Sequence, residues 1–399
     1  MRILLLTDWN TNRGGAERYI VSLRDGLRAR GDQAMLVSCG ARSVDTAPSD
    51  ARVYGSDFPP AQAFLQIVNP VAGSSIRRHV KAFKPDVAVV SQFAYHLSSS
   101  ALNALSGIPH VITTMDYKSI CPLGTRVLHD GTVCTQKAGV SCRDNNCVGF
   151  AHWMRDVPRY NLIRKGVSRA SRVLCPTDWM VRQLGQQGID AHSLPLGVES
   201  PSQRFAHKPA PHPKFVYSGR LSAEKGVTLL VRAFAKFVTD VPHASLTLVG
   251  DGPLRQTLER SIERLDLARS VTVTGWVSPA RVDEELSDAW ALIAPSIWAE
   301  PFGLAVVEAI MRGVPVVASN RGGFAENVNA GVTGLLVEPG DEAALIHGLR
   351  RIASRSVFAS GSIDPADVAG ARERFSLDAH IDRMRSVLVQ VVQSARASA

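Results

Sequence analysis

The stretch PSIWAEPFGLAVVEA, residues Pro295–Ala309, decides the fold of this chain. It follows a short apolar run, Leu292–Ala294, and passes through a Pro-Phe-Gly turn into a helical pattern that begins near Gly303. The free N–H groups at the start of such a helix form a site for an anion. Glu300 stands before the turn, and Glu308 stands inside the helix, where a carboxylate can accept hydrogen bonds from a ribose diol.

The same alternation of strand and helix extends along most of the chain. Continuous apolar strands separated by helices predict parallel sheets that are covered on both faces. Ligands of such sheets bind beyond the carboxyl ends of the strands. The expected strands are Ile3–Thr7, Gln33–Ser38, Asp86–Ser91, Val111–Thr114, Val173–Cys175, Phe215–Ser218, Ser245–Val249, Val271–Thr274, Leu292–Ala294 and Val314–Ser319.

The alternation breaks in a proline-rich stretch, where five prolines lie between Leu194 and Lys214. This break predicts a linker between two doubly wound, Rossmann-like α/β domains that face a central cleft. The expected division is a first domain of residues 1–197, a linker of 198–213, a second domain of 214–375, and a C-terminal helix in 376–399. That last helix could pack back on the first domain, because its apolar residues share one face.

Composition and charge narrow the class of protein. The 399 residues are 45% hydrophobic and 20% charged, which is typical of a globular protein and excludes a disordered chain or a coiled coil. No apolar run approaches the roughly 20 residues that span a bilayer, and no signal peptide is visible, so a cytoplasmic location is expected. Residues 1–200 carry 23 Lys and Arg against 15 Asp and Glu, whereas the remainder carries 22 against 21. The first half is therefore the basic half.

Three further motifs carry chemistry. SGRLSAEKG, residues Ser218–Gly226, places Gly219, Arg220 and Lys225 after the first strand of the second domain, where two cations suit a diphosphate. VGDGP, residues 249–253, is a second glycine turn that contains Asp251. GVPVVASNRGGFAE, residues 313–326, repeats the design of strand, paired glycines and helix start.

Taken in order with GGAERY at residues 14–19, these motifs resemble the retaining glycosyltransferases of family 4, which have the GT-B fold. The resemblance implies that Arg220 and Lys225 neutralise the donor diphosphate, that Glu308 binds the donor ribose and that Glu300 contacts the donor sugar. These would be the catalytic and anchoring groups, with Glu300, Arg220 and Lys225 closest to the reaction. The other expected donor-binding residues are Gly15, Gly219, Asp251, Val277, Phe302, Gly303 and Leu304, and the expected acceptor-side residues are Gly14, Gly15, Met115 and Asp116.

The resemblance also implies a reaction. A sugar would move from a nucleotide-diphosphate sugar to an envelope glycan, a lipid-linked acceptor or a small molecule, by same-face substitution without a metal, and the two cations would stabilise the leaving diphosphate. One departure is Met115, which stands where the family usually has a histidine that touches the donor sugar. It leaves open two alternatives, a non-catalytic nucleotide-sugar-binding member and a GT-B sugar-nucleotide epimerase.

Four of the six cysteines, Cys121, Cys134, Cys142 and Cys147, fall in one aperiodic insertion, residues 118–149. A structural zinc site, disulfides and free thiols all fit this cluster. The spacing lacks the paired CxxC of common zinc sites, and a cytoplasmic location disfavours disulfides.

A basic helix is expected at residues 75–84, where Arg77, Arg78, Lys81 and Lys84 alternate with an apolar face. It is either a sheet-covering helix with a solvated side or a helix that binds an anionic membrane surface, as a peripheral membrane protein would. No nucleic-acid recognition motif accompanies these cations, so nucleic acid is not an expected partner.

Overall fold

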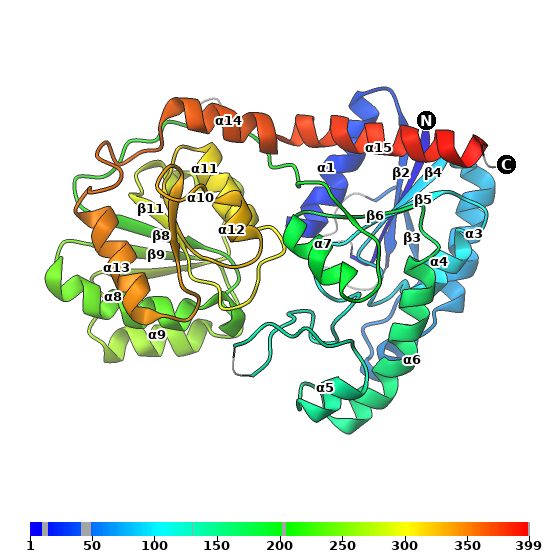
Figure 1. Ribbon diagram of the computed structural model, residues 1–399, viewed down its shortest axis with the longest axis horizontal. Coiled ribbons are helices and arrows are strands. Elements are labelled where there is room, and N and C mark those ends of the chain that lie inside the picture. The colour runs from blue at the N-terminus through cyan, green and yellow to red at the C-terminus, as the bar shows by residue number, and fades with distance from the viewer. Residues whose placement is uncertain (10–14, 41–48, 130, 202–204, 398–399) are drawn as a thin grey trace. The chain divides into compact units, whose positions relative to one another are not determined.

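The computed structural model describes residues 1–9, 15–40, 49–129, 131–201 and 205–397, which form two compact units. The first unit comprises Met1–Gly197 together with Leu377–Ala399, and the second comprises Val198–Ser376. Each contains one parallel sheet with helices packed around it (Figure 1), so the α/β class expected from the sequence is confirmed.

The first unit is built on a seven-stranded sheet in the order β3-β2-β1-β4-β5-β6-β7. β1 pairs in parallel with β2 on one side and with β4 on the other, so the strand order reverses between β1 and β4. The strands are β1 (Arg2–Thr7), β2 (Gln33–Cys39), β3 (Ala51–Val53), β4 (Val87–Ser91), β5 (His110–Thr113), β6 (Arg172–Cys175) and β7 (His192–Ser193). Every residue of β4 is buried, as a strand in the middle of a doubly covered sheet requires.

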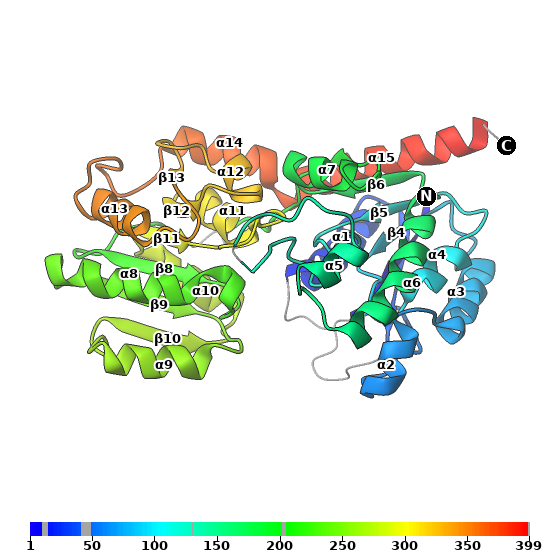
Figure 2. The same ribbon diagram turned by 60° about the horizontal axis from the view of Figure 1, so that its bottom comes forward.

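Eight helices of the described chain belong to this unit, and α3, α4 and α6 lie side by side (Figure 2). Side chains cap several of them: Asn69 accepts a hydrogen bond from the N–H of Ala72 at the start of α3, and Thr177 caps α7. The helices are α1 (Gly15–Ala29), α2 (Pro59–Leu65), α3 (Pro70–Phe83), α4 (Ser98–Ala104), α5 (Val140–Asp144), α6 (Phe150–Val167), α7 (Asp178–Gly185) and α15 (Leu377–Ala397).

The last of these helices, α15, packs against α1 and β4 (Figure 1). Its His380 is fully buried, and both of its ring nitrogens are hydrogen-bonded. Tyr19 Oη lies 2.9 Å from Nε2, and the carbonyl oxygen of Pro195 lies 2.7 Å from Nδ1. Arg385 of α15 also pairs with the buried Asp32, at 2.7 Å. The helix therefore completes the core of the first unit.

The second unit is built on a six-stranded parallel sheet in the order β10-β9-β8-β11-β12-β13, whose order reverses between β8 and β11. Its elements are β8 (Lys214–Ser218), η1 (Ala223–Lys225), α8 (Val227–Asp240), β9 (Ser245–Val249), α9 (Arg255–Arg264), β10 (Val271–Gly275), α10 (Pro279–Ser287), β11 (Ala291–Ala294), α11 (Leu304–Met311), β12 (Val316–Ser319), α12 (Gly323–Asn327), β13 (Gly334–Val337), α13 (Glu342–Ala353) and α14 (Pro365–Phe375).

The core of this unit is split by the sheet into two apolar layers. On one side Phe215 of β8 packs against Phe234 and Phe237 of α8, and α13 lies beside α8 (Figure 2). On the other side Val216 of the same strand joins residues of α10, α11 and α14. Side chains of successive strand residues point to opposite faces, so one apolar strand supplies both layers.

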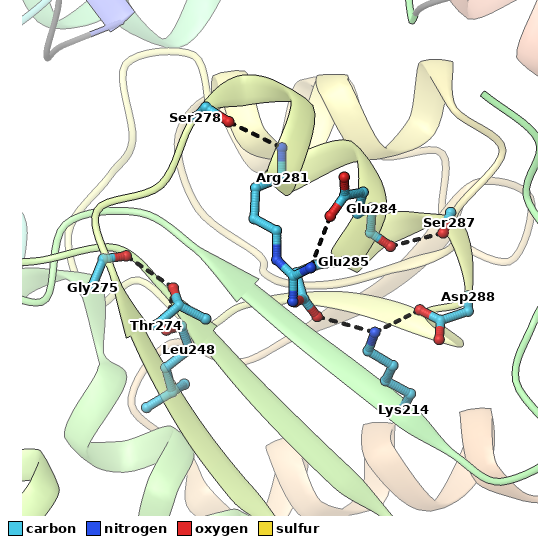
Figure 3. Close-up of polar contacts among 10 residues, drawn as sticks. All are labelled: Lys214, Leu248, Thr274, Gly275, Ser278, Arg281, Glu284, Glu285, Ser287 and Asp288. Carbon is cyan, nitrogen blue, oxygen red and sulfur yellow. Dashed lines mark hydrogen bonds and ion pairs between the residues drawn. The ribbon is translucent and has the colours of Figure 1, made fainter. Parts of the chain in front are cut away.

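Ion pairs fix α10 at the edge of the second layer (Figure 3). Lys214, at the start of β8, lies 3.0 Å from the buried carboxylate of Glu285 and 2.6 Å from that of Asp288. Arg281 binds Glu285 from the other side at 2.6 Å, and Ser278 caps the helix. Helix α10 is therefore held at both of its ends.

Several boundaries differ from those expected. The strand expected at residues 314–319 begins only at Val316, because the N–H of Val314 bonds to Ala309 at the end of α11 and Pro315 has no N–H to donate. Three strands were not expected: β3 has three residues, β7 has two exposed residues, and β13 begins with a glycine, a poor strand former.

The proline-rich residues after 204 lie along the second unit. Lys208 and Ala210 donate backbone hydrogen bonds to Ser287 and Asp288, and Trp290 donates its indole N–H to Ala210. Within the residues that the structure describes, no helix is long and apolar enough to cross a membrane.

Candidate functional site

The motifs of the second unit meet where its strand order reverses, at the carboxyl ends of β8 and β11. The turn after β8 contains Gly219, and the turn after β9 contains Gly250. A Cβ atom on Gly250 would lie 1.9 Å from the carbonyl oxygen of Gly219, so only glycine permits the two turns to touch. The reversal point is where open α/β sheets bind ligands.

An ion pair joins the segment that follows β8 to the segment that follows β11. Lys225 Nζ lies 2.6 Å from Glu300 Oε1, and Ser296 Oγ donates to the same oxygen at 2.8 Å. The Glu300 side chain is only 8% exposed, and the ammonium group of Lys225 lies over the ring of Trp298, 5.1 Å from its centroid. The pair thus presents a fixed cation and a fixed acceptor at the sheet edge.

Gly226 determines the position of that cation. Its φ is 69°, in the left-handed region, and a Cβ atom there would lie 2.0 Å from the carbonyl oxygen of Pro295. The loop that carries Lys225 can therefore rest on the end of β11 only with glycine at this position.

The other expected cation, Arg220, is exposed, and its guanidinium makes no hydrogen bond or ion pair with the described residues. Its carbonyl oxygen accepts a hydrogen bond from Tyr217 Oη at 2.7 Å, which fixes the backbone of the turn. Asp251 is also exposed, and it accepts from the N–H of Gly252 and pairs with Arg255. Asp251 therefore shapes its own turn, while Arg220 is available to a ligand.

The Pro-Phe-Gly turn leads into α11. Phe302 is buried and packs edge-on against Phe375, so its side chain belongs to the core. Gly303 has a φ of 91° and is the N-cap of α11, where it supplies no side chain to the first N–H groups. Leu304 is the first residue of the helix, and Glu308 is half-buried one turn later. These free N–H groups suit an anion.

The paired glycines after β12 pack directly against the backbone of this turn. Cβ atoms on Gly322 and Gly323 would each lie 2.6 Å from backbone atoms of the turn, and the N–H of Gly323 donates to the carbonyl oxygen of Glu300 at 2.7 Å. Val277, expected near a nucleobase, is half-buried after β10 and packs against the second apolar layer.

The first unit has its own cavity where its strand order reverses, between β1 and β4. Asp8 and Gln92, which follow these two strands, line it together with Met115, Asp116 and Lys118. Asp8 accepts hydrogen bonds from the backbone N–H groups of three successive residues, Tyr95, His96 and Leu97, at 2.6, 2.9 and 2.7 Å. Burial nevertheless raises the pKa of Asp8 to about 6.

Two more carboxylates lie near this cavity. Burial raises the pKa of Asp116, whose carboxylate accepts from the N–H of Lys118 at 2.8 Å. Burial also raises the pKa of Glu17 in α1, and the negative charge of Asp116 adds to the effect. Gly15 is the first residue of α1, whereas Gly14 lies outside the described residues.

Sequence reasoning missed several of these side chains. Asp8 and Gln92 follow strands of the predicted sheet directly, so their place at its carboxyl edge could have been read from the pattern. Ser296 and Trp298 lie within the quoted stretch, but only the fold shows that they contact Glu300 and Lys225.

The four clustered cysteines all line a second cavity of the first unit, next to the buried Arg126. No group of three or more His, Cys, Asp or Glu in the described part of the chain is already arranged to hold a metal ion. The other two cysteines, Cys39 and Cys175, are buried in strands.

The expected basic helix is the second half of α3. Its cations, Arg77, Arg78, Lys81 and Lys84, are exposed, whereas Ile76 is fully buried against the unit. Lys84 ends the helix in the left-handed conformation.

Family models match both halves of the chain. Residues 14–197 match a "Glycosyl transferase 4-like domain" and residues 199–358 match "Glycosyl transferases group 1". Among curated proteins, the glycogen synthase of Mycobacterium tuberculosis is 30% identical over 53% of this chain and 48% of its own length. The 2-deoxystreptamine N-acetyl-D-glucosaminyltransferase of Niallia circulans is 31% identical over 33% of each chain. The matches thus span less than half the length of these relatives.

Solved structures match over almost the whole chain. Sucrose-phosphate synthase from Thermosynechococcus elongatus has a TM-score of 0.74 at 19% identity, covering 98% of this chain and 99% of its own. Anabaena HepE in complex with UDP and glucose has a TM-score of 0.70 at 20% identity, with the same coverage. WaaG, a glycosyltransferase involved in lipopolysaccharide biosynthesis, has a TM-score of 0.69 at 15% identity. These likenesses confirm the GT-B fold.

Proposed function

Because its two halves match the two family models, the chain belongs to the group 1 glycosyltransferases, and we propose that it transfers a sugar from a nucleotide-diphosphate sugar to a hydroxyl acceptor. The observation that carries the proposal is the pair of Lys225 and Glu300 at the reversal point of the second sheet, with the available Arg220 on the adjoining turn. Two cations beside a helix start suit a diphosphate leaving group.

In this proposal, binding of the nucleotide-sugar donor breaks the ion pair of Lys225 and Glu300 and gives each residue a new partner. The diphosphate would take Lys225 and Arg220 as counter-charges and meet the uncapped N–H groups of α11. Glu300 would then give up the ammonium group at 2.6 Å and accept a hydrogen bond from a sugar hydroxyl instead. Glu308, half-buried in α11, would accept from the ribose diol.

We also propose that the sugar is transferred with retention of its anomeric configuration and without a metal, as expected for family 4. A diphosphate oxygen would take the proton of the acceptor hydroxyl on the face from which it departs. A covalent intermediate on Glu300 is less favoured, because the hydrogen bond from Ser296 to its Oε1 remains when Lys225 leaves and weakens that oxygen as a nucleophile.

The acceptor would enter the cavity of the first unit. Met115 and Asp116 both line it, and Lys118 lies 5.1 Å from the ring centroid of Tyr95. Since Met115 offers no hydrogen bond donor where the family usually has a histidine, sugar choice would depend on other groups.

The experiment is turnover of the purified protein with UDP-, GDP-, ADP- and TDP-sugars, measured as release of the nucleoside diphosphate. Arg220→Ala is expected to lower turnover about 100-fold to 1,000-fold, the usual cost of one group that stabilises the leaving charge. Arg232→Ala, which removes an exposed arginine of α8, is the matched control. Nucleotide binding without turnover of any donor would favour the non-catalytic alternative.

The anomeric configuration has its own measurement. NMR of the transferred sugar is expected to show the configuration of the donor. Inversion would contradict same-face substitution, and a changed nucleotide sugar with no transferred product would indicate an epimerase.

We further propose that the first unit binds an anionic membrane surface, which would give access to a lipid-linked acceptor. Four exposed cations of α3 support this, as do Phe58 and Phe64 at α2, which are 65% and 63% exposed. Charge reversal of Arg77, Arg78, Lys81 and Lys84 to glutamate should abolish binding to phosphatidylglycerol vesicles. Reversal of Arg260 and Arg264 on α9 is the control, and unchanged binding by the α3 variant would refute the membrane role.

A further inference from the structure

The segment from Lys118 to Gly149 has little apolar core of its own. Its regular structure in the described residues is the five-residue helix α5 and an isolated antiparallel bridge between Val127 and Val133. Leu123 and Val140 are exposed, at 41% and 65%. A loop of this length without a core needs another source of order, such as a metal or a cross-link.

Local turns bring the four thiols of this segment together. The N–H of Cys121 donates to Tyr117, that of Cys134 to Arg126, and that of Cys147 to Cys142, at 2.7 to 2.9 Å. All four cysteines are half-buried and line one cavity. Cys142 is the middle residue of α5 and Cys147 follows the helix, and both are close enough to Cys121 and Cys134 to interact with them electrostatically.

Arg126 lines the same cavity and supplies a buried positive charge beside the four cysteines. It is only 2% exposed, and its guanidinium donates to the carbonyl oxygen of Gln136 at 2.7 Å and, weakly, to Gln183 at 3.4 Å. Its buried Nε has no partner among the described residues, and no carboxylate there pairs with it. Its φ of 57° adds backbone strain. A buried guanidinium without a counter-charge lowers the stability of the fold, so a negatively charged group in this cavity would be stabilising.

We infer that Cys121, Cys134, Cys142 and Cys147 bind one Zn²⁺ as four thiolates, and that Arg126 offsets part of the negative charge of this centre. Four thiols release four protons when they bind Zn²⁺, and the tetrathiolate centre carries a net charge of minus two. Two disulfides would be neutral and would leave the guanidinium uncompensated. Since no ligand set is preformed in the described residues, the ion has to draw the half-buried thiols inward.

The proposed zinc centre adjoins the acceptor-side cavity of the first unit. Lys118 and Ser119, at the start of the same segment, line the acceptor-side cavity, and Ile120 lines the cysteine cavity. Zinc would therefore fix the wall of the acceptor-side cavity from outside it, as a structural ion remote from the reacting groups.

The test is metal analysis of the full-length protein purified without chelator. One zinc per chain is expected, and its replacement by cobalt should give the visible absorption of a tetrahedral thiolate site. Absence of metal, iron in place of zinc, or an intact mass that shows two disulfides in the unreduced protein would overturn the inference.

Variants separate this site from adventitious binding. Cys142→Ser with Cys147→Ser should lose the zinc, whereas the matched control Cys175→Ala should keep it; retention of zinc by the double variant would refute the assignment. Arg126→Gln should weaken zinc binding by about 10-fold to 100-fold in chelator competition, the usual cost of losing an outer partner. Unchanged affinity would refute the role of Arg126. The cobalt spectrum of the unmodified protein tests the site even if a variant does not fold.

Discussion

Asp8 provides a test of the cavity between β1 and β4 that needs no substrate. Its carboxylate is 1% exposed, and burial raises its pKa from the usual 3.8 to about 6. The folded protein therefore holds this proton more tightly than the unfolded chain. The free energy of unfolding changes with pH according to the difference in protons bound by the unfolded and folded states. The stabilisation by the protonated Asp8 is therefore fully present below about pH 3.8 and is lost as the pH rises through about 6.

The size of the effect follows from the same values. At about 1.4 kcal/mol for each tenfold difference in proton affinity, the rise to about 6 corresponds to about 3 kcal/mol of unfolding free energy. Asp8→Asn removes this dependence. The variant should also lose about 1–3 kcal/mol at every pH, because its amide nitrogen would face one of three N–H donors that now point at Asp8.

The assay is urea unfolding of the full chain between about pH 4 and pH 7, followed by circular dichroism. The free energy of unfolding of the unmodified protein minus that of Asp8→Asn should fall by about 2.4 kcal/mol across this range, most of the full effect. Asp190→Asn, which removes a carboxylate that is 94% exposed in the same unit, controls for the change in charge. A difference that stays constant or rises with pH would refute the account of the buried carboxylate.

Two further predictions concern the packing of each unit. Burial lowers the pKa of His380 from 6.5 to about 4, so the unmodified protein should lose about 3 kcal/mol of unfolding free energy as the pH falls from 6.5 to 4. His380→Gln should remove this pH dependence, which is opposite in sign to that of Asp8. Unfolding curves in which the variant keeps the loss would contradict the assignment. Gly226→Ala should destabilise the second unit by at least about 2 kcal/mol in thermal unfolding, because alanine would have a left-handed φ and its Cβ would strike Pro295. Gly370→Ala, with nothing within 4 Å of the added Cβ in α14, is the control and should be neutral or stabilising; equal melting temperatures for the two variants would count against the steric argument.

The sequence predicted the fold class because long apolar strands and helical patterns alternate in it. What it could not supply were contacts between distant residues. The sequence places Lys225 and Glu300 in separate motifs, and only the parallel pairing of β8 with β11 brings them to 2.6 Å. The same holds for Asp8, whose three N–H partners follow β4 and are remote in sequence.

Short strands and segments without periodicity could not be predicted from the sequence. β7 has two exposed residues and so carries no apolar pattern at all. Arg126 could not be singled out among the basic residues of the first half, because its burial depends on the fold of a segment without periodicity. Local patterns thus identify elements, whereas the site depends on which elements meet.

The position of α15 in the first unit has a consequence for the order in which the protein can fold during synthesis. The chain enters the second unit at Val198 and leaves it at Ser376, and these two residues form a parallel β-bridge, so every element of the second unit emerges from the ribosome before α15 does. The first unit begins the chain, but Tyr19 lacks its partner His380, and Asp32 lacks one of its partners, Arg385, until α15 has emerged. The second unit can therefore mature first, and the half that is translated earliest is finished last.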